Sequence, residues 1–289
     1  MEFIAPTTWA DALAAKAEFP DAVPITGGTD VMVDLNFDRQ RPSVLLDLTR
    51  IPELAEWSRV DERVRLGSGV TYSCVIDELS DLLPGLAMAS RTVGSPQIRN
   101  RGTVGGNLGA ASPAGDAHPP LLAAGAEVEL ASVNGTRTVG IDEFYTGVKK
   151  HAGRADELIA AVHVTPPSGP QQFSKIGTRN AMVISVSAFS LALHPDSLRV
   201  GTGIGSAAPT PRRAEEAEVF LAAALDDEGL WESRGALPES VVTEFCELVK
   251  TAAAPIDDVR GTAAYRLHSL AVMARRNLAW TWADYAKEH

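Results

Sequence analysis

Hydrophobic residues follow two different spacings at the start of the chain. From Trp9 onward they recur at helical intervals behind Thr7 and Thr8, either of which can cap a helix, and this predicts a helix over residues 7–19. Short apolar runs at residues 23–25 and 44–48 are typical of buried strands. The chain therefore begins with a helix and two strands, and these belong to one packed unit.

Alternation of polar and apolar residues begins at Arg63, where arginines flank Val64 and Leu66 as in a half-exposed strand. Asn134-Gly135 lies between two such stretches and fits a type I′ hairpin turn. The same reasoning predicts helices over residues 71–83, 86–93 and 119–124, and strands over residues 128–130, 136–139 and 158–164.

Residues 166–170 read Pro-Pro-Ser-Gly-Pro, a composition that excludes regular structure. We expect a linker here, between one domain over residues 1–165 and a C-terminal domain over residues 171–289. After the linker the pattern predicts strands over residues 173–176, 183–193 and 198–200, and then helices over residues 214–225, 239–252 and from 262 to near the end.

Residues 94–116 are rich in glycine, with six in this stretch. Glycine lets a ligand approach the backbone closely, and successive exposed N–H groups in such a loop favour an anion, phosphate above all. We interpret the segment as a diphosphate-binding loop, to which Thr103, Asn107 and Ser112 add polar groups without bulk. Arg99 and Arg101 fit a contact with a diphosphate or a partner as well as they fit solvated loop charges.

A shorter glycine turn, Thr26-Gly27-Gly28-Thr29-Asp30, lies between two apolar runs. Neither glycine segment matches a P-loop or a dinucleotide fingerprint. A glycine-rich segment alone fits a tight turn as well as a ligand loop. Two of them, far apart in the sequence, indicate one extended ligand with phosphates at its middle.

The glycines of residues 201–206 have another explanation. Ser206 stands where a dinucleotide fingerprint has its last glycine, and Pro209 and Pro211 fall where its helix would begin. We expect the end of a strand packed closely against a neighbouring element.

Composition excludes several classes of protein. The formal net charge of −11 argues against binding to nucleic acid, whose phosphates would be repelled. No apolar run is long enough to span a membrane, and the N-terminal residues do not resemble a secretory signal, so we expect a cytoplasmic protein. Cys74 and Cys246 are far apart and predict neither a cluster nor a metal site; buried free thiols fit them better.

Several motifs together resemble one family over essentially the whole chain. They are residues 26–30, Thr103-Val104-Gly105-Gly106-Asn107, Ala111-Ser112-Pro113-Ala114-Gly115-Asp116, and residues 173–179, 208–214 and 257–266. They are similar to motifs of the FAD-binding medium subunit of the molybdenum hydroxylases, the family of xanthine dehydrogenase and carbon monoxide dehydrogenase.

The resemblance implies the α+β class, with a two-lobed, PCMH-like FAD-binding domain whose lobes lie at about residues 1–55 and 56–165. It also implies a C-terminal domain, a three-stranded antiparallel sheet with a helical bundle, that covers the flavin side. By motif matching, backbone N–H groups after Ile25 would wrap the diphosphate, Asp116 would accept from a hydroxyl or adenine donor, and Lys175 would lie near the isoalloxazine. The implied cofactor-binding residues are Ile25, Thr26, Gly27, Gly28, Thr29, Asp30, Val31, Val93, Thr103, Gly105, Gly106, Asn107, Ser112, Asp116, Ile159 and Lys175.

The same resemblance implies an oxidoreductase subunit that transfers electrons. A large subunit with the molybdenum cofactor would oxidise the substrate, and [2Fe–2S] clusters in a small subunit would pass electrons to FAD on this chain. From there they would reach NAD or another acceptor, in a dimer of heterotrimers. Xanthine dehydrogenase is the relative it resembles most; carbon monoxide, nicotine or aldehyde dehydrogenase and a free-standing FAD oxidoreductase are the alternatives.

Other residues bear on this interpretation. We find no nucleophile–base pair and no residues in this chain that we assign as catalytic, which agrees with a flavin that does the chemistry. Val183 stands where many relatives carry an aspartate. Asp257 and Asp258 fit capping and salt bridges at a helix start better than acid–base chemistry. His118 fits a packing or surface position better than a contact with the cofactor.

Overall fold

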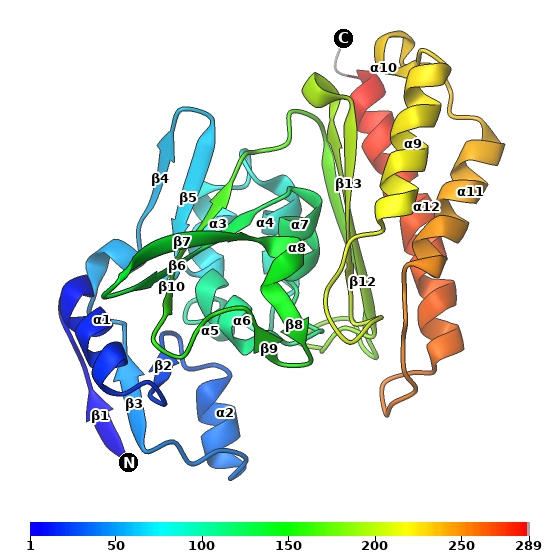
Figure 1. Ribbon diagram of the computed structural model, residues 1–289. Helices are drawn as coiled ribbons and strands as arrows, with labels where there is room; N and C mark the ends of the chain where they lie inside the picture. Colours follow the sequence, from blue (N-terminus) through cyan, green and yellow to red (C-terminus); the bar gives the residue numbers. More distant parts are fainter. Residues whose placement is uncertain (288–289) are drawn as a thin grey trace.

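The computed structural model describes residues 1–287. The first lobe is a small parallel sheet in the order β1-β3-β2, with α1 and α2 around it (Figure 1). Its elements are β1 (Glu2–Ile4), α1 (Trp9–Glu18), β2 (Val23–Ile25), α2 (Val31–Asn36) and β3 (Val44–Asp47). The Thr8 hydroxyl accepts a hydrogen bond from the backbone N–H of Asp11, so Thr8 is the one of the two candidate threonines that caps the first helix.

The second lobe is built on an antiparallel five-stranded sheet in the order β4-β5-β10-β6-β7. Its strands are β4 (Trp57–Val60), β5 (Arg63–Gly67), β6 (Glu127–Ser132), β7 (Gly135–Gly140) and β10 (Leu158–Val164). Its helices are α3 (Tyr72–Glu78), α4 (Pro84–Thr92), α5 (Pro96–Arg99), α6 (Val104–Ala110), α7 (His118–Ala123) and α8 (Ile141–Phe144). A short 3-10 helix, η1 (Pro52–Leu54), leads into this lobe, and the hairpin of β8 (Tyr145–Gly147) and β9 (Lys150–His151) lies beside it.

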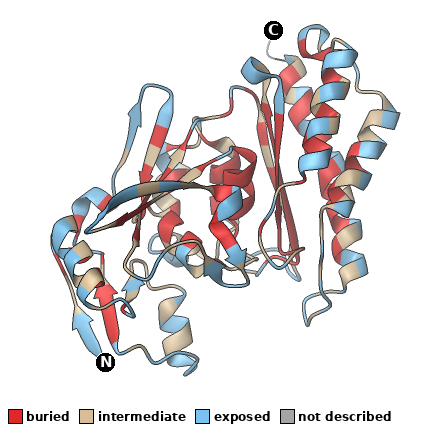
Figure 2. Ribbon diagram, viewed as in Figure 1, coloured by how far each residue is buried: buried red, intermediate tan, exposed pale blue. Residues whose placement is uncertain are grey.

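The C-terminal part is a three-stranded antiparallel sheet, β11-β12-β13, with helices on its far face (Figure 1). Its elements are β11 (Gln171–Ile176), β12 (Ser187–His194), η2 (Pro195–Ser197), β13 (Arg199–Gly205), α9 (Glu215–Asp227), α10 (Leu230–Ser233), α11 (Glu239–Thr251) and α12 (Ala263–Lys287). Figure 2 shows the sheet buried between these helices and the second lobe.

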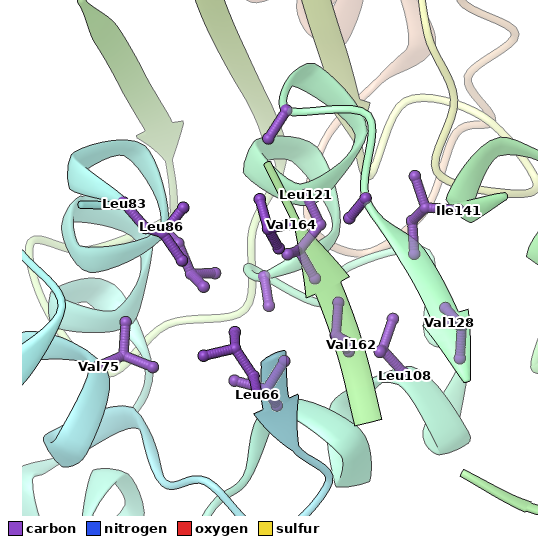
Figure 3. Close-up of a cluster of buried hydrophobic side chains, with 14 of the residues drawn as sticks. Leu66, Val75, Leu83, Leu86, Leu108, Leu121, Val128, Ile141, Val162 and Val164 are labelled. Carbon is purple, nitrogen blue, oxygen red and sulfur yellow. The ribbon is translucent and has the colours of Figure 1, made fainter. Parts of the chain in front are cut away.

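Hydrophobic side chains form separate cores on either side of the C-terminal sheet. Figure 3 shows the core of the second lobe, where Leu66, Val162 and Val164 from the sheet meet Leu86, Leu108 and Leu121 from the helices. The other large core lies between the C-terminal sheet and its helices, around Phe189 and Phe245. This packing fixes α4, α6 and α7 against the sheets, and all three helices carry residues of the glycine-rich segment or border it.

The structure corrects several sequence predictions in detail. The helix predicted to reach residue 83 ends at Glu78, and the strand predicted from residue 183 begins at Ser187. The strand predicted to end at residue 200 runs on to Gly205. The hairpin at residues 132–135 is present, but its turn is not type I′: Asn134 is absent from the residues with positive φ, and Ser132 pairs with Gly135 across the turn.

The expected close packing of the 201–206 segment is confirmed. A Cβ on Gly201 would overlap the carbonyl oxygen of Ala123, and one on Gly203 would overlap that of Pro119. Only glycine therefore allows β13 to lie this close to α7.

Candidate functional site

The first glycine turn presents a row of open backbone donors. Among the described residues, no acceptor pairs with the backbone N–H groups of residues 27–31. The turn follows β2 at the carboxyl end of a parallel sheet, and Gly28 adopts a φ of 75°, which favours glycine. Consecutive unpaired N–H groups in a turn form a concavity that favours an anion.

The second glycine segment is not the cradle of open N–H groups that the sequence suggested. Residues 94–116 contain α5 and α6 instead of one long loop. The first N–H groups of α6 are already paired: Val104 donates to the carbonyl of Val70, Gly105 to that of Ser68, and Gly106 to the Thr103 hydroxyl, at 3.0, 3.1 and 2.9 Å. The sequence interpretation was wrong on this point, because the threonine cap and a neighbouring strand end satisfy the donors of the helix.

The glycines of this segment serve close packing. A Cβ on Gly105 would overlap the side chain of Ser68. Gly105 therefore holds α6 against the end of β5, and its N–H is engaged, so the backbone donor expected from it is not free.

The two glycine segments touch each other. The hydroxyls of Thr26 and Thr103 lie 2.9 Å apart and form a hydrogen bond. Gly27 packs on the backbone of Arg101, where any Cβ would overlap the carbonyl oxygen. Gly106 lies above the two hydroxyls: its Cβ would be 2.8 Å from Oγ1 of Thr103 and 3.1 Å from Oγ1 of Thr26. The segments are thus brought to one place, as expected of a single extended ligand.

Asp116 and Lys175 form a buried ion pair between the second lobe and the C-terminal sheet. Nζ of Lys175, on β11, lies 2.6 Å from Oδ2 of Asp116, and the side chains are 7% and 9% exposed. Thr92 at the end of α4 joins the pair: its carbonyl accepts from Lys175 at 3.2 Å, and its hydroxyl donates to Asp116 at 3.3 Å. Burial raises the pKa of the Asp116 carboxyl, while Lys175 and Thr92 act in the opposite direction.

Two buried acceptors of the segment have no partner among the described residues. These are Oδ1 of Asp116 and Oδ1 of Asn107. Buried oxygen atoms of this kind are normally hydrogen-bonded, so each points to a donor supplied by a ligand or by water. Both residues were predicted from the sequence to bind the cofactor.

The remaining predicted residues border the same region. The carbonyl of Val93 accepts a hydrogen bond from Arg99 at 3.1 Å. The Ser112 hydroxyl accepts from the N–H of Ala114 at 3.3 Å. Cδ1 of Ile159, on β10, would lie 3.6 Å from a Cβ on Gly109 of α6. Val93 and Ser112 therefore use these groups within the chain, and Ile159 packs beside α6.

The charged residues and the histidine singled out in the sequence have structural contacts. Arg99 donates to the carbonyls of Arg91, Val93 and Gly94 and so caps the end of α4, which assigns it a structural role. Asp257 accepts from the first N–H of α12, and Asp258 pairs with Arg260 and Arg266, as predicted. His118 is fully buried, so of the packing and surface positions expected for it the structure shows the packing one.

Two residues of this site were missed by the sequence reasoning. Thr92 contacts both members of the ion pair, and the buried hydroxyl of Tyr72 has no partner among the described residues. Thr92 and Tyr72 both lay inside predicted helices. No spacing or motif distinguished either residue from ordinary packing.

The residues present fit a dinucleotide such as FAD. Open N–H groups at residues 27–31 suit a diphosphate, and the unpaired oxygens of Asn107 and Asp116 suit hydroxyl or amino donors elsewhere on the molecule. Within residues 1–287 no group of His, Cys, Asp and Glu side chains is arranged to hold a metal ion. Among the same residues no helix is long and apolar enough to cross a membrane.

Two family models match the chain. Residues 1–167 match the FAD binding domain in molybdopterin dehydrogenase, and residues 174–281 match the CO dehydrogenase flavoprotein C-terminal domain. The chain is 31% identical over 282 residues to the xanthine dehydrogenase FAD-binding subunit of Escherichia coli O157:H7, covering 93% of this chain and 91% of the relative. It is 34% identical over 211 residues to the nicotinate dehydrogenase FAD-subunit of Eubacterium barkeri, covering 70% of this chain and 71% of the relative.

A solved structure shares the whole architecture. A chain in the crystal structure of the Cu,Mo-CO dehydrogenase in its cyanide-inactivated form superposes with a TM-score of 0.89 at 27% identity, over 98% of each chain. The two matched domains, the relatives and the shared fold agree with the motifs brought together in the site. This chain belongs to the FAD-binding medium subunits of the molybdenum hydroxylases, oxidoreductases of the xanthine dehydrogenase and carbon monoxide dehydrogenase type.

Proposed function

We propose that this chain binds FAD between its two N-terminal lobes and passes electrons from a partner's [2Fe–2S] clusters to NAD or another acceptor. The observation that carries the proposal is the row of unpaired N–H groups at residues 27–31. The hydrogen bond between Thr26 and Thr103 holds this turn against the second glycine segment, residues 94–116. The named relatives of the chain, at 31% to 34% identity, serve xanthine and nicotinate dehydrogenases.

Each part of the site has one role in this proposal. The N–H groups of residues 27–31 bind the diphosphate, and Asn107 and Asp116 accept hydrogen bonds through their unpaired oxygens. Lys175 brings a positive charge from the C-terminal sheet to the flavin side. Bound FAD supplies the redox chemistry, since it accepts electrons singly and releases them as a pair, which no side chain can do.

The division of labour is proposed from the chain's membership of the family. The molybdenum cofactor and the [2Fe–2S] clusters are assigned to a large and a small partner subunit, in a dimer of heterotrimers. The substrate is oxidised in the large subunit, and this chain does not select it. Ion pairing and hydrogen bonding keep the residues of the flavin side in place; the chain's own contribution is binding and electrostatic tuning.

A visible absorption spectrum of the purified chain, recorded with and without FAD, tests the proposal. We expect flavin bands that remain after gel filtration, and release of unmodified FAD on denaturation. A folded chain that retains no FAD, alone or when purified with its native partners, would contradict it. Reduction of NAD and of an artificial acceptor by the complex would then identify the acceptor.

A further inference from the structure

Helix α4 of the second lobe lies alongside β11 of the C-terminal sheet, with a polar contact near each end. The N–H of Gly85, at the start of α4, donates to Oε1 of Gln171, at the start of β11, at 3.3 Å. The carbonyl of Thr92, the last residue of α4, accepts from Nζ of Lys175 at 3.2 Å. The end of this helix therefore meets the buried lysine of the other domain.

The carbonyl groups at the end of α4 are divided between two cations. The last carbonyls of a helix have no partner within it, and this end of the helix favours a positive charge. Arg99 donates to three carbonyls of the region, and the carbonyl of Thr92 accepts from Lys175 instead. The helix end thus provides one acceptor for the lysine.

The Thr92 hydroxyl lies between the helix and Asp116. Its Oγ1 is 2.8 Å from the carbonyl oxygen of Ala89 and 3.3 Å from Oδ2 of Asp116. A hydroxyl has one proton, and a carbonyl and a carboxylate only accept, so the two acceptors share it. The same Oδ2 also accepts from Nζ of Lys175, at 2.6 Å. Thr92 therefore contacts both members of the ion pair, each with a different group.

These contacts leave one donor and one acceptor of the pair free. An ammonium group has three N–H donors, and among the described residues the one of Lys175 has two acceptors, Asp116 and Thr92. Oδ1 of Asp116 has no partner among the same residues. Both side chains are buried, and buried polar groups are normally hydrogen-bonded. The remaining N–H and Oδ1 are therefore available to a ligand.

We propose that Thr92 is a positioning residue: its carbonyl and hydroxyl hold Lys175 and Asp116 at the end of α4, so that one N–H of the lysine and Oδ1 of the aspartate stay free for the bound cofactor. The carbonyl belongs to the backbone, so the identity of residue 92 matters through the hydroxyl. That the free groups serve FAD rests on the proposed function, whereas the hold on the pair does not depend on it.

Two substitutions and one control isolate the contact with Asp116. Thr92→Val removes the hydroxyl and keeps the shape of the side chain, and Thr92→Ser keeps the hydroxyl. Thr251, at the end of α11, is the matched control: its hydroxyl donates to the carbonyl of Leu248 at 2.8 Å and to no carboxylate of the described residues. Thr251→Val loses only the bond to its helix, so any further effect of Thr92→Val belongs to Asp116.

NMR of the full chain with ¹³C-labelled aspartate, without FAD, tests the hold on the pair; Asp116→Asn assigns the signal. Burial raises the pKa of Asp116, and Lys175 and the hydrogen bond from Thr92 oppose this. Lys175 and Tyr72 are the ionisable groups in electrostatic range of Asp116, and no variant changes them. In Thr92→Val we expect the carboxyl signal to shift at pH 7 and to titrate at higher pH.

The signal in Thr92→Ser and in Thr251→Val should coincide with wild type. An Asp116 signal that does not move in Thr92→Val, or that moves as much in Thr92→Ser, would overturn the proposal. The signal at pH 7 decides the matter if the protein unfolds before Asp116 titrates.

FAD binding tests whether the held pair serves the cofactor. The FAD dissociation constant should rise about 3- to 5-fold in Thr92→Val, the effect of one weak hydrogen bond, and stay within about 2-fold of wild type in Thr92→Ser and Thr251→Val. Equal FAD affinity of Thr92→Val and wild type would overturn the proposal. If wild type binds no FAD, the proposed function fails, and a signal shift confined to Thr92→Val still supports the hold on the pair.

Discussion

Gly106 is the residue of α6 that faces the threonine hydroxyls of both glycine segments. A Cβ there would be 2.8 Å from the Thr103 hydroxyl that caps α6 and 3.1 Å from that of Thr26. We expect Gly106→Val to break the hydrogen bond between these hydroxyls and to fill the space beside the open N–H groups. The purified variant should remain folded by circular dichroism but lose its FAD, measured as the ratio of visible to ultraviolet absorbance.

Gly109 provides the matched control on the same helix. A Cβ at this position meets only Cδ1 of Ile159, at an ordinary distance of 3.6 Å, and alanine in a helix is more favourable than glycine by about 0.5–1 kcal/mol. Gly109→Ala should therefore keep its FAD content and unfold at the same or a higher temperature. Full FAD content in a folded Gly106→Val protein would contradict the assignment of this corner to the cofactor.

His118 gives the protein a pH dependence whose sign follows from burial. Its pKa is about 3 in the folded chain and 6.5 when exposed, so between these values the unfolded chain binds a proton that the folded chain does not. The contribution of neutral, buried His118 to the free energy of unfolding is therefore fully present above pH 6.5. It is lost as the pH drops towards 3, by up to about 1.4 kcal/mol per pH unit.

Urea unfolding at pH 7 and pH 4.5 measures this effect. We expect wild type to lose about 2–3 kcal/mol more than His118→Gln over this range. Burial also lowers the pKa of His151 and His194, which contribute in the same direction, and the variant removes only the part that belongs to His118. An identical pH dependence in the two proteins would show that His118 becomes exposed before it titrates.

At the scale of elements, helices and strands were predictable where the signals that specify them, hydrophobic spacing and caps, are local in the sequence. The helix capped by Thr8, the strand at residues 23–25 and the long C-terminal helix follow from spacing alone. The glycine-rich segment was misjudged because its order comes from distant partners. The carbonyls of Ser68 and Val70 accept from its N–H groups, and no sequence pattern marks residues so far away as partners. Contacts with residues distant in the sequence thus stabilise helices in a segment whose composition is typical of a loop.

The site shows the same division between local and distant information. The motifs marked Asn107, Asp116 and Lys175, because their residue types and order match a family. The contacts of Thr92 depend on how α4 packs against the C-terminal sheet, and Thr92 has no motif of its own. Sequence therefore indicated the residues that are proposed to meet the cofactor, while the structure was needed to find a residue that contacts two of them.

The contact between β13 and α7 permits a prediction about packing. Gly203 lies against the carbonyl of Pro119, where a Cβ would overlap the oxygen. Gly203→Ala must push the strand from the helix and should destabilise the protein by about 1–3 kcal/mol, as overpacked sites do. In Gly235→Ala the new Cβ meets only side-chain atoms, Cδ2 of Leu230 at 3.4 Å and Oγ of Ser233 at 3.7 Å. Its unfolding free energy, measured by thermal or urea denaturation, should lie within about 0.5 kcal/mol of wild type. Equal effects of the two substitutions would mean that β13 and α7 can separate without penalty.

In the whole molecule, the Lys175–Asp116 pair links the C-terminal sheet to the second lobe beside the proposed flavin side. Both side chains are at least nine-tenths buried, so removal of one leaves the other charged without a partner. Breaking a buried pair in this way costs about 3–5 kcal/mol, whereas an exposed pair contributes at most about 1 kcal/mol. The same two residues thus hold the second lobe and the C-terminal sheet together and take part in the proposed binding of FAD.

Lys175→Met should lower the unfolding free energy of the cofactor-free chain by about 3 kcal/mol, while the double variant Lys175→Met/Asp116→Leu should recover most of the loss because no charge remains alone. Lys250→Met is the control, since its pair with Glu247 lies on the surface of α11.

FAD at 100 times its dissociation constant should raise the unfolding free energy of wild type by about 2.7 kcal/mol. The same FAD concentration should stabilise both Lys175 variants by less. If Lys175→Met lost no more stability than Lys250→Met, the pair would not join the domains. If FAD stabilised the double variant as much as wild type, the flavin side would lie elsewhere.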